Sequence, residues 1–219
     1  MPTFTQPTSY ASIRLGPIAE PQGSIAFMAA VLKEHLYDFL SYPQMFSEMD
    51  ATLATSLFAP LASNLYLSPE KLRKDTRTEW CAVLPMAVSD QSKTIAEMGI
   101  RIHNSAAPQP LKDIHWQNTA AGAMPSRGSA LIERSLMVAV CKLERIVSFR
   151  AADAIYVWLT AMVPILRLEF GANSVSVTGV QGVSQEDRPL FSEIPGDPLV
   201  IKISVWSLTD FQYGAVSPP

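Results

Sequence analysis

The chain has few of the residues that usually carry chemistry: three His, two Cys and ten Gly among 219 residues. The glycines form neither a G-x-G-x-x-G nor a G-x-x-x-x-G-K pattern, so no loop that cradles phosphate is predicted. His35, His103 and His115 lie too far apart for a metal-binding pair on one helix. The sequence therefore predicts no catalytic residue, no cofactor and no metal ligand.

The two cysteines, Cys81 and Cys141, lack neighbouring Cys or His residues that would complete a zinc-site spacing, so we expect buried free thiols. Residues 1–20 lack the basic region followed by an apolar region that export requires, which indicates cytoplasmic synthesis. The longest uncharged stretches are interrupted by polar residues and proline or are too short, so we expect no segment that spans a bilayer.

Charged residues are also scarce, at 17% of the chain, whereas an average soluble protein has about 25%. The net charge is −3 and no basic run occurs, which disfavours binding to nucleic acid through a positive field. Residues 81–150 are net positive and residues 151–219 net negative. This charge difference is explained either by oppositely charged faces that meet between subunits or by chance variation.

Proline is abundant, with 17 residues, and four of them lie in residues 1–23, which we interpret as an extended arm. Apolar residues then recur at helical spacing from Ser24 to the residue before Pro43. A second helical pattern covers about 44–58, and Ser68 followed by Pro69 predicts the start of a short helix. The portion 24–75 is therefore predicted to be helical.

The remainder of the domain, residues 76–208, has mixed patterns. A strand is expected from Trp80 to Met86, with Pro85 at an edge or a bulge. Residues 104–128 lack periodicity and are predicted to form a long loop. Residues 129–147 fit a helix and a buried strand equally well, whereas 150–166 fit a helix that Pro164 ends or kinks.

Two antiparallel strands, Val175–Val177 and Leu199–Leu208, are expected near the C-terminus, joined by a long acidic loop. The fold class is thus α+β: a helical N-terminal portion is followed by a helix packed on a small antiparallel sheet. A single domain would cover residues 24–208, with an extended tail over 209–219.

Among the sequence patterns, two groups that contain acidic residues come closest to a metal-binding pattern. Four carboxylates lie in the loop before the last strand, but the order and glycine of a calcium loop are missing, so an exposed acidic loop is favoured: Glu186, Asp187, Glu193 and Asp197. His35 and Asp38 have a spacing that a metal could bridge, although a solvated helix face is the favoured interpretation.

An apolar outward face on the last strand favours coverage by another layer or another subunit. Val200, Trp206 and Leu208 share that face, and Trp116 lies in the long loop, so these four are the candidate interface residues. Low charge together with terminal arms and a long loop is typical of subunits in closed assemblies. We therefore expect a homo-oligomer.

The succession from Ser135–Cys141 through the helix 151–166 to the strands 175–177 and 199–205 resembles tail terminator and neck proteins of tailed bacteriophages. The resemblance covers about the last 90 residues and is one of element order. It implies a non-enzymatic subunit of a ring, usually sixfold, that joins tail to head in the virion, with neighbouring structural proteins as partners. Its negative C-terminal region would repel passing DNA.

Two other classes of function stay open from the sequence. A small-molecule enzyme would have its site beside the long loop, with His103, His115 and Asp113 as candidates. An adaptor would use that loop on one heterologous partner. If the protein is not part of a virion, we expect it in the cytoplasm.

Overall fold

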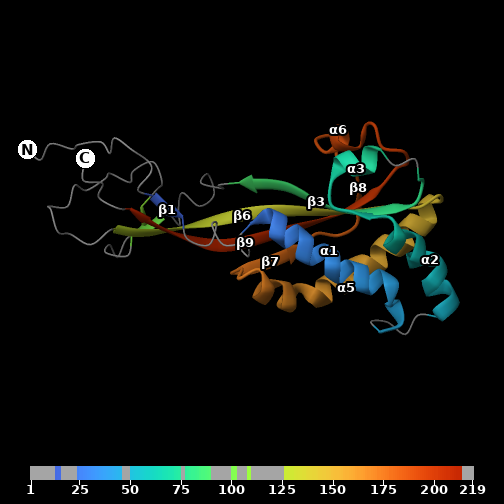
Figure 1. The fold of residues 1–219 in the computed structure, drawn as a ribbon, viewed down its shortest axis with the longest axis horizontal. Helices are drawn as coiled ribbons and strands as arrows, with labels where there is room; N and C mark the ends of the chain where they lie inside the picture. Colours follow the sequence, from blue (N-terminus) through green and yellow to red (C-terminus); the bar gives the residue numbers. More distant parts are fainter. Residues whose placement is uncertain are drawn as a thin grey trace, which may run out of the picture.

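The computed structural model describes residues 13–15, 24–45, 50–74, 77–89, 100–102, 108–109 and 126–213. These residues form helices and one largely antiparallel sheet, which confirms the α+β class (Figure 1). The sheet has nine strands and is larger than the small sheet predicted.

Two long strands form the centre of the sheet. β6 (Ser126–Cys141) pairs antiparallel with β9 (Leu199–Tyr213), from Val140 opposite Leu199 to Ser126 opposite Tyr213. At about 3.4 Å per residue, this ribbon is about 50 Å long, and it runs well past the helices (Figure 1). Residues 129–141 are thus strand, which decides between the two interpretations that the sequence left open.

Shorter strands flank this central pair. The outer edge of β6 carries β3 (Trp80–Ser89) and β4 (Ile100–Ile102), and the free edge of β9 carries β8 (Gln181–Gly182), β7 (Ser174–Val177) and β1 (Ile13–Leu15). β2 (Leu65–Tyr66) is parallel to β3, and β5 (Pro108–Gln109) pairs with β4. The antiparallel pairing of β7 with β9 confirms the prediction for the C-terminal strands.

Pro85 lies where the pairing of β3 with β6 shifts register, between Pro85 and Ala87. On the other side of β3, β2 reaches only Cys81 and Ala82. The missing proline N–H is therefore placed at a bulge near an edge, as predicted.

Three helices cover one face of the sheet: α1 (Ile25–Ser41), α2 (Ala51–Ser63) and α5 (Arg145–Glu169) (Figure 1). Alternate residues of β9 enter this main core, and the predicted inward set is fully buried: Leu199, Ile201, Ile203 and Val205. The even-numbered residues of β6 from Leu136 to Val140 enter the same core. The burial of both sets follows from the two-residue period of a strand.

Side-chain caps determine where the first two helices begin. The Ser24 hydroxyl accepts from the Phe27 N–H at 3.0 Å, and Asp50 accepts from the N–H groups of Thr52 and Leu53. The helix expected over 44–58 is instead a short 3-10 helix, η3 (Pro43–Met45), followed by α2, which begins at the Asp50 cap and runs to Ser63. The short helix α3 (Pro69–Arg73) starts at the predicted Ser68 cap.

The helix α5 is longer at both ends than the predicted 150–166. It starts at Arg145 and continues for five residues beyond Pro164, so the proline does not end it. Leu166 and Phe170, on the far side of the proline, are buried in the main core and hold this last part against the sheet. By length and composition alone α5 is apolar enough to cross a membrane, which differs from the expectation drawn from the sequence, although one of its faces packs in the core.

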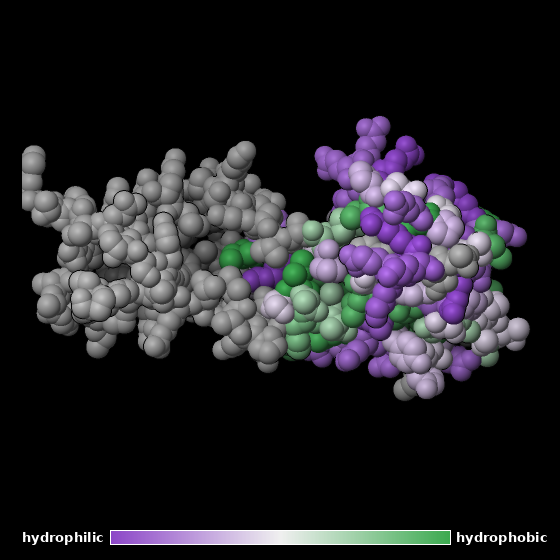
Figure 2. Space-filling model, turned by 45° about the horizontal axis from the view of Figure 1, so that its top comes forward, coloured by the Kyte–Doolittle hydropathy of each residue, from purple (hydrophilic) through white to green (hydrophobic). Residues whose placement is uncertain are grey.

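A second layer covers one end of the opposite face of the sheet. It consists of α3, α6 (Arg188–Phe191) and the residues around them, hereafter the lobe, residues 183–198 with α3 (Figure 1). Trp80 of β3 stacks on Phe191 of the lobe, and its indole N–H donates to the Pro195 carbonyl at 3.3 Å. The outer surface of the lobe is largely hydrophilic (Figure 2).

The boundaries predicted for the arm, the loop and the tail also differ from the structure. β9 runs through Tyr213, so the last strand includes residues assigned to the tail 209–219. Ile13–Leu15, in the predicted arm 1–23, pairs with the end of β9. Residues 126–128, at the end of the predicted loop 104–128, belong to β6, because pairing with β9 satisfies their backbone groups.

Trp158 of α5 is in the core, as expected, and stacks on Phe39 with ring centroids 4.9 Å apart. Its indole N–H is the one buried side-chain polar atom without a hydrogen-bond partner among the described residues. We expect Trp158→Phe to change the free energy of unfolding by less than about 1 kcal/mol, because removing the unsatisfied donor offsets the lost apolar area.

Trp80→Phe is the matched control for this substitution. The Trp80 indole is also buried but has the Pro195 carbonyl as its acceptor. Urea unfolding should show that Trp80→Phe costs about 1 kcal/mol more than Trp158→Phe. Equal costs for the two variants would contradict the prediction.

Candidate functional site

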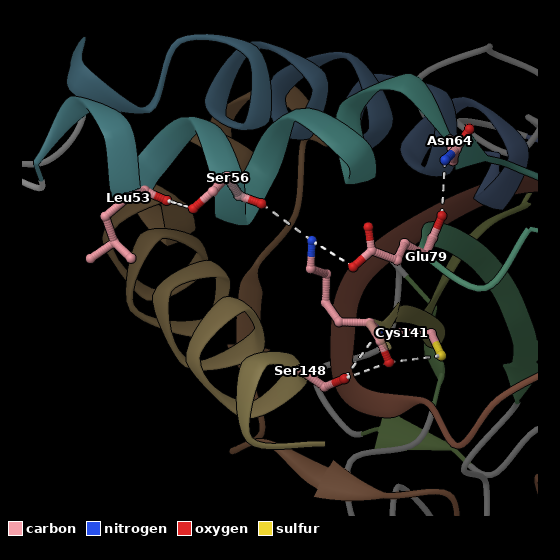
Figure 3. Close-up of polar contacts among 7 residues, drawn as sticks. Leu53, Ser56, Asn64, Glu79, Cys141 and Ser148 are labelled. Carbon is pink, nitrogen blue, oxygen red and sulfur yellow. Dashed lines mark hydrogen bonds and ion pairs between the residues drawn. The ribbon is translucent and has the colours of Figure 1, made fainter. Parts of the chain in front are cut away.

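The most connected polar cluster among the described residues surrounds Lys142, at the turn from β6 into α5 (Figure 3). Its ammonium lies 3.0 Å from Glu79 Oε1 and donates to the Ser56 carbonyl at 3.4 Å. Only 4% of the Lys142 side chain is exposed, against 23% for Glu79. One cation thus links β6 to the start of β3 and to α2.

The backbone of the same turn is closed by Ser148, in the first turn of α5. The Lys142 N–H donates to Ser148 Oγ at 3.0 Å, and the Ser148 hydroxyl lies 3.4 Å from the Lys142 carbonyl (Figure 3). The N-cap residue Glu144 makes no side-chain cap bond, so Ser148 supplies the contact that fixes the entry into α5.

Asn64, at the end of α2, extends the cluster on the other side of Glu79. Its amide nitrogen donates to the Glu79 carbonyl at 2.9 Å, and its own backbone carbonyl accepts from the Cys81 N–H at 3.0 Å. Arg77 donates to the Asn64 side-chain oxygen. Because each group bonds to a different element, the arrangement acts as a clamp between α2, β3, β6 and α5.

A nucleophilic or Schiff-base lysine needs a free amine that substrate can reach. The Lys142 amine has two oxygen partners and is buried, so the geometry fits the clamp and does not fit such chemistry.

The four carboxylates predicted to crowd one loop are separated in the structure. Asp187 Oδ2 lies 2.7 Å from Lys202 Nζ on β9, Glu193 pairs with Arg73 of α3 at 3.5 Å, and Asp197 pairs with Arg145 of α5. Glu186 is exposed. Since each of the paired carboxylates faces a different cation, they do not converge on a cation site. Asp187 and Asp197 fasten the lobe to β9 and α5, and Glu193 joins the loop to α3 within the lobe.

Asp187 is the most buried of these acids, and its carboxylate also accepts from the Ser184 hydroxyl at 2.6 Å. Burial alone would raise the pKa of Asp187, but hydrogen bonds from Lys202 and Ser184 and the charge of Lys202 outweigh it and hold the pKa below its ordinary value. The ionised form therefore stabilises the folded lobe.

We expect Asp187→Asn to lower the free energy of unfolding at pH 7 by about 1 kcal/mol, since Lys202 is partly exposed. A depressed folded-state pKa stabilises above the unfolded pKa and loses that stabilisation as the pH falls. The difference between wild type and variant should thus shrink below about pH 4. Urea titrations at pH 7, 5 and 3 measure it, and a difference that is constant over this range would refute the prediction.

Cys81 and Cys141 are both buried free thiols, as predicted. Cys81 is opposite Val140 and Cys141 opposite Trp80, so the two thiols are on neighbouring strands but on opposite faces of the sheet. Desolvation raises the pKa of Cys81 to about 12 and that of Cys141 to about 11. Both sulfurs are therefore protonated and unreactive at neutral pH.

His35 contacts Glu169 of α5, with Nε2 2.6 Å from Oε2, and this contact joins α1 to α5. Within the residues that the structure describes, no three His, Cys, Asp or Glu side chains come together as a metal ligand set. His103, His115 and Asp113, the candidates for an enzyme site, lie outside the described residues.

The four candidate interface residues have different surroundings. Val200 is fully buried beneath the lobe, so its own chain covers it and it is not an interface residue in the folded protein. Trp206 is half-buried, in register with Glu133 of β6 and Ser174 of β7. The Leu208 side chain and Trp116 lie outside the described part.

A hollow of about 350 Å³ lies between the end of α1 and α2, lined among others by Tyr37, Tyr42, Thr55 and Ala59. Among the described residues its lining includes no carboxylate, histidine or lysine. The polar groups that these residues present to the hollow are hydroxyls and one side-chain amide.

Sequence reasoning missed the Lys142 clamp and the outward face of α5. Lys142 and Glu79 are far apart in the sequence, and no local pattern connects them. The α5 face did leave a signal, because Ile146, Val157 and Leu168 fall outside the inward arc of the helix, but the predicted helix 150–166 included only the second of them.

The chain was compared with protein-family models and with curated proteins, and neither comparison finds a match.

Proposed function

We propose that the protein is a non-enzymatic structural subunit of a homo-oligomeric assembly. The observation that carries this proposal is the apolar outward face of α5. Five large apolar side chains along this helix are exposed although the opposite face already packs on the sheet: Ile146, Phe149, Val157, Ile165 and Leu168. Contiguous exposed apolar surface on a soluble protein marks an interaction site, and an assembly would bury this face.

The long β6–β9 ribbon supports the same proposal. It extends beyond the helices (Figure 1). Arg134 of β6 donates to Ser207 of β9, and both residues are buried. In the proposed assembly the ribbon would contact a neighbouring copy. Subunits that interlock through such extensions gain contacts without enlarging their cores.

Several buried or partly buried polar side chains of the described residues form contacts that join one helix or strand to another. Lys142, Asp187 and His35 each join two or more elements, and both thiols are buried and protonated. This use of charge favours a structural role over catalysis.

On the resemblance of element order, we place this subunit at the junction of head and tail in a bacteriophage virion, in a ring that is usually sixfold. Its partners would be copies of itself and the adjoining structural proteins. The net negative C-terminal region suits a passage for DNA, because like charge repels phosphate.

Multi-angle light scattering at micromolar concentration, with electron microscopy of the same sample, tests the proposal. We expect a mass several times 24.0 kDa and closed particles. A stable 24.0 kDa monomer that forms no particles would overturn it.

A further inference from the structure

The outward face of α5 contains a straight apolar line, which we name the α5 stripe: Ile146, Val157 and Leu168, exposed by 61%, 60% and 82%. The three residues are spaced by 11 positions, which is about three helical turns, so they lie above one another along the helix. Pro164 and Ala161 lie on the same side and add apolar surface. The stripe thus runs nearly the full length of α5.

Ile146 lies 11 positions before Val157, and Leu168 lies 11 positions after it. If a second α5 lies antiparallel on the first, Ile146 of each copy faces Leu168 of the other, and the two Val157 side chains meet at the centre. A surface that matches itself after a half-turn is what a two-fold contact between identical chains requires. We propose that two copies of this chain pack α5 against α5, antiparallel, across a two-fold axis beside Val157.

The charges on the stripe are compatible with this pairing. Arg150 and Asp153 are its charged residues, and they have opposite signs. In the antiparallel register Arg150 faces Pro164 of the other copy and Asp153 faces Ala161, so each charged residue of the stripe faces an uncharged one.

The size of the stripe also suits a second helix. From Ile146 to Leu168 it measures about 33 Å at 1.5 Å per residue, and a packed helix is about 10 Å wide. Two such faces together measure about 660 Å², so residues beside the stripe would have to supply the rest of the roughly 1,000 Å² that a specific interface buries. A second copy of α5 has the required length and shape.

This inference goes beyond the proposed function and does not depend on ring closure. Neighbours in a ring touch through two different surfaces, whereas the α5 contact uses the same surface twice. The two-fold pair would exist in solution whether or not larger rings form.

Val157→Asp tests the contact, because it places two carboxylates together in an apolar interface. We expect the dissociation constant of the two-copy unit to rise by roughly 100-fold or more in sedimentation equilibrium. Leu53→Asp is the matched control, since Leu53 is an exposed leucine on α2. It should leave the dissociation constant unchanged.

Val157→Cys gives a second readout that does not depend on weakening the fold. Helix axes about 8–10 Å apart bring facing Cα atoms to about 4–5 Å, which a disulfide spans. The native thiols are buried, so the introduced thiol is the reactive one. Mild oxidation should link Val157→Cys chains in pairs and should leave Leu53→Cys chains unlinked.

Each outcome distinguishes this inference from the proposed function. A monomeric wild type overturns both. Larger oligomers that Val157→Asp leaves intact, with no preferential linking of Val157→Cys, overturn the α5 contact alone, and a two-copy unit without larger assemblies supports the contact and overturns the ring. If monomeric wild type floats with phosphatidylcholine–phosphatidylglycerol vesicles and Val157→Asp does not, the stripe binds membrane and the two-fold contact is overturned.

Discussion

Replacing Lys142 with Met should lower the free energy of unfolding by about 2–4 kcal/mol, a larger loss than from substitution of any exposed lysine. The substitution keeps the aliphatic stem and removes the ammonium. Glu79 then loses its cation and the Ser56 carbonyl loses a donor, and both are held at the junction of α2, β3 and β6. The magnitude is set below that of a fully buried pair, because the Glu79 side chain is 23% exposed.

Urea unfolding followed by circular dichroism measures this loss. Lys71→Met on α3 is the matched control, since Lys71 is exposed, and it should change stability by no more than about 0.5 kcal/mol. Adding Glu79→Gln to Lys142→Met removes the uncompensated carboxylate, so the double variant should recover part of the loss. Equal stabilities of the Lys142→Met and Lys71→Met variants would show that the clamp contributes nothing.

Gly196→Ala should be the second strongly destabilising substitution. Gly196 has φ +101°, where a residue with a Cβ is strained by about 1–3 kcal/mol. The new Cβ would also overlap Cys141 Sγ, and overpacking of this kind costs about 1–3 kcal/mol more. Either the Cys141 thiol or the segment around Gly196 would have to shift to relieve the overlap.

Two glycines separate these contributions. Gly171, after α5, has φ +58° but open space around its Cβ position, so Gly171→Ala reports strain alone. Gly179 has neither a positive φ nor a neighbour within 4 Å, and Gly179→Ala should be close to neutral. Adding Cys141→Ala to Gly196→Ala should remove the overlap and keep the strain. If Gly196→Ala lowers the midpoint of thermal unfolding no more than Gly179→Ala does, Gly196 does not lie in close contact with Cys141.

The segment 129–147 shows why the sequence left two interpretations open. Leu136–Cys141 is continuously apolar because β6 has a core on each face: Leu136, Val138 and Val140 face the helices, while Met137, Ala139 and Cys141 face the lobe. A strand covered on both sides loses its two-residue alternation. Because residues up to Cys141 belong to β6, α5 begins only at Arg145. The mixed pattern across 129–147 did not show this boundary in the sequence.

Val200 illustrates the same limit for the candidate interface. The alternation of β9 correctly assigned Val200 to the face opposite Ile201. The residues that cover it, including Phe191 and Ile194, come from the acidic loop, whose pattern predicted only an exposed turn. The sequence predicted that this face of β9 is covered, but it did not predict that residues 183–198 of the same chain cover it.

By itself the sequence determined the α+β class, the first helix from Ser24, the Ser68 cap of the short helix, the alternation of the last strand and the burial of both thiols, because periodicity and capping act between residues a few positions apart. Only the tertiary structure decided that Lys142 meets Glu79 and that the lobe covers Val200. Only there, within the described part of the chain, is the outward line of α5 seen to be exposed. These outcomes depend on which distant segments become neighbours, and local spacing carries no information about that.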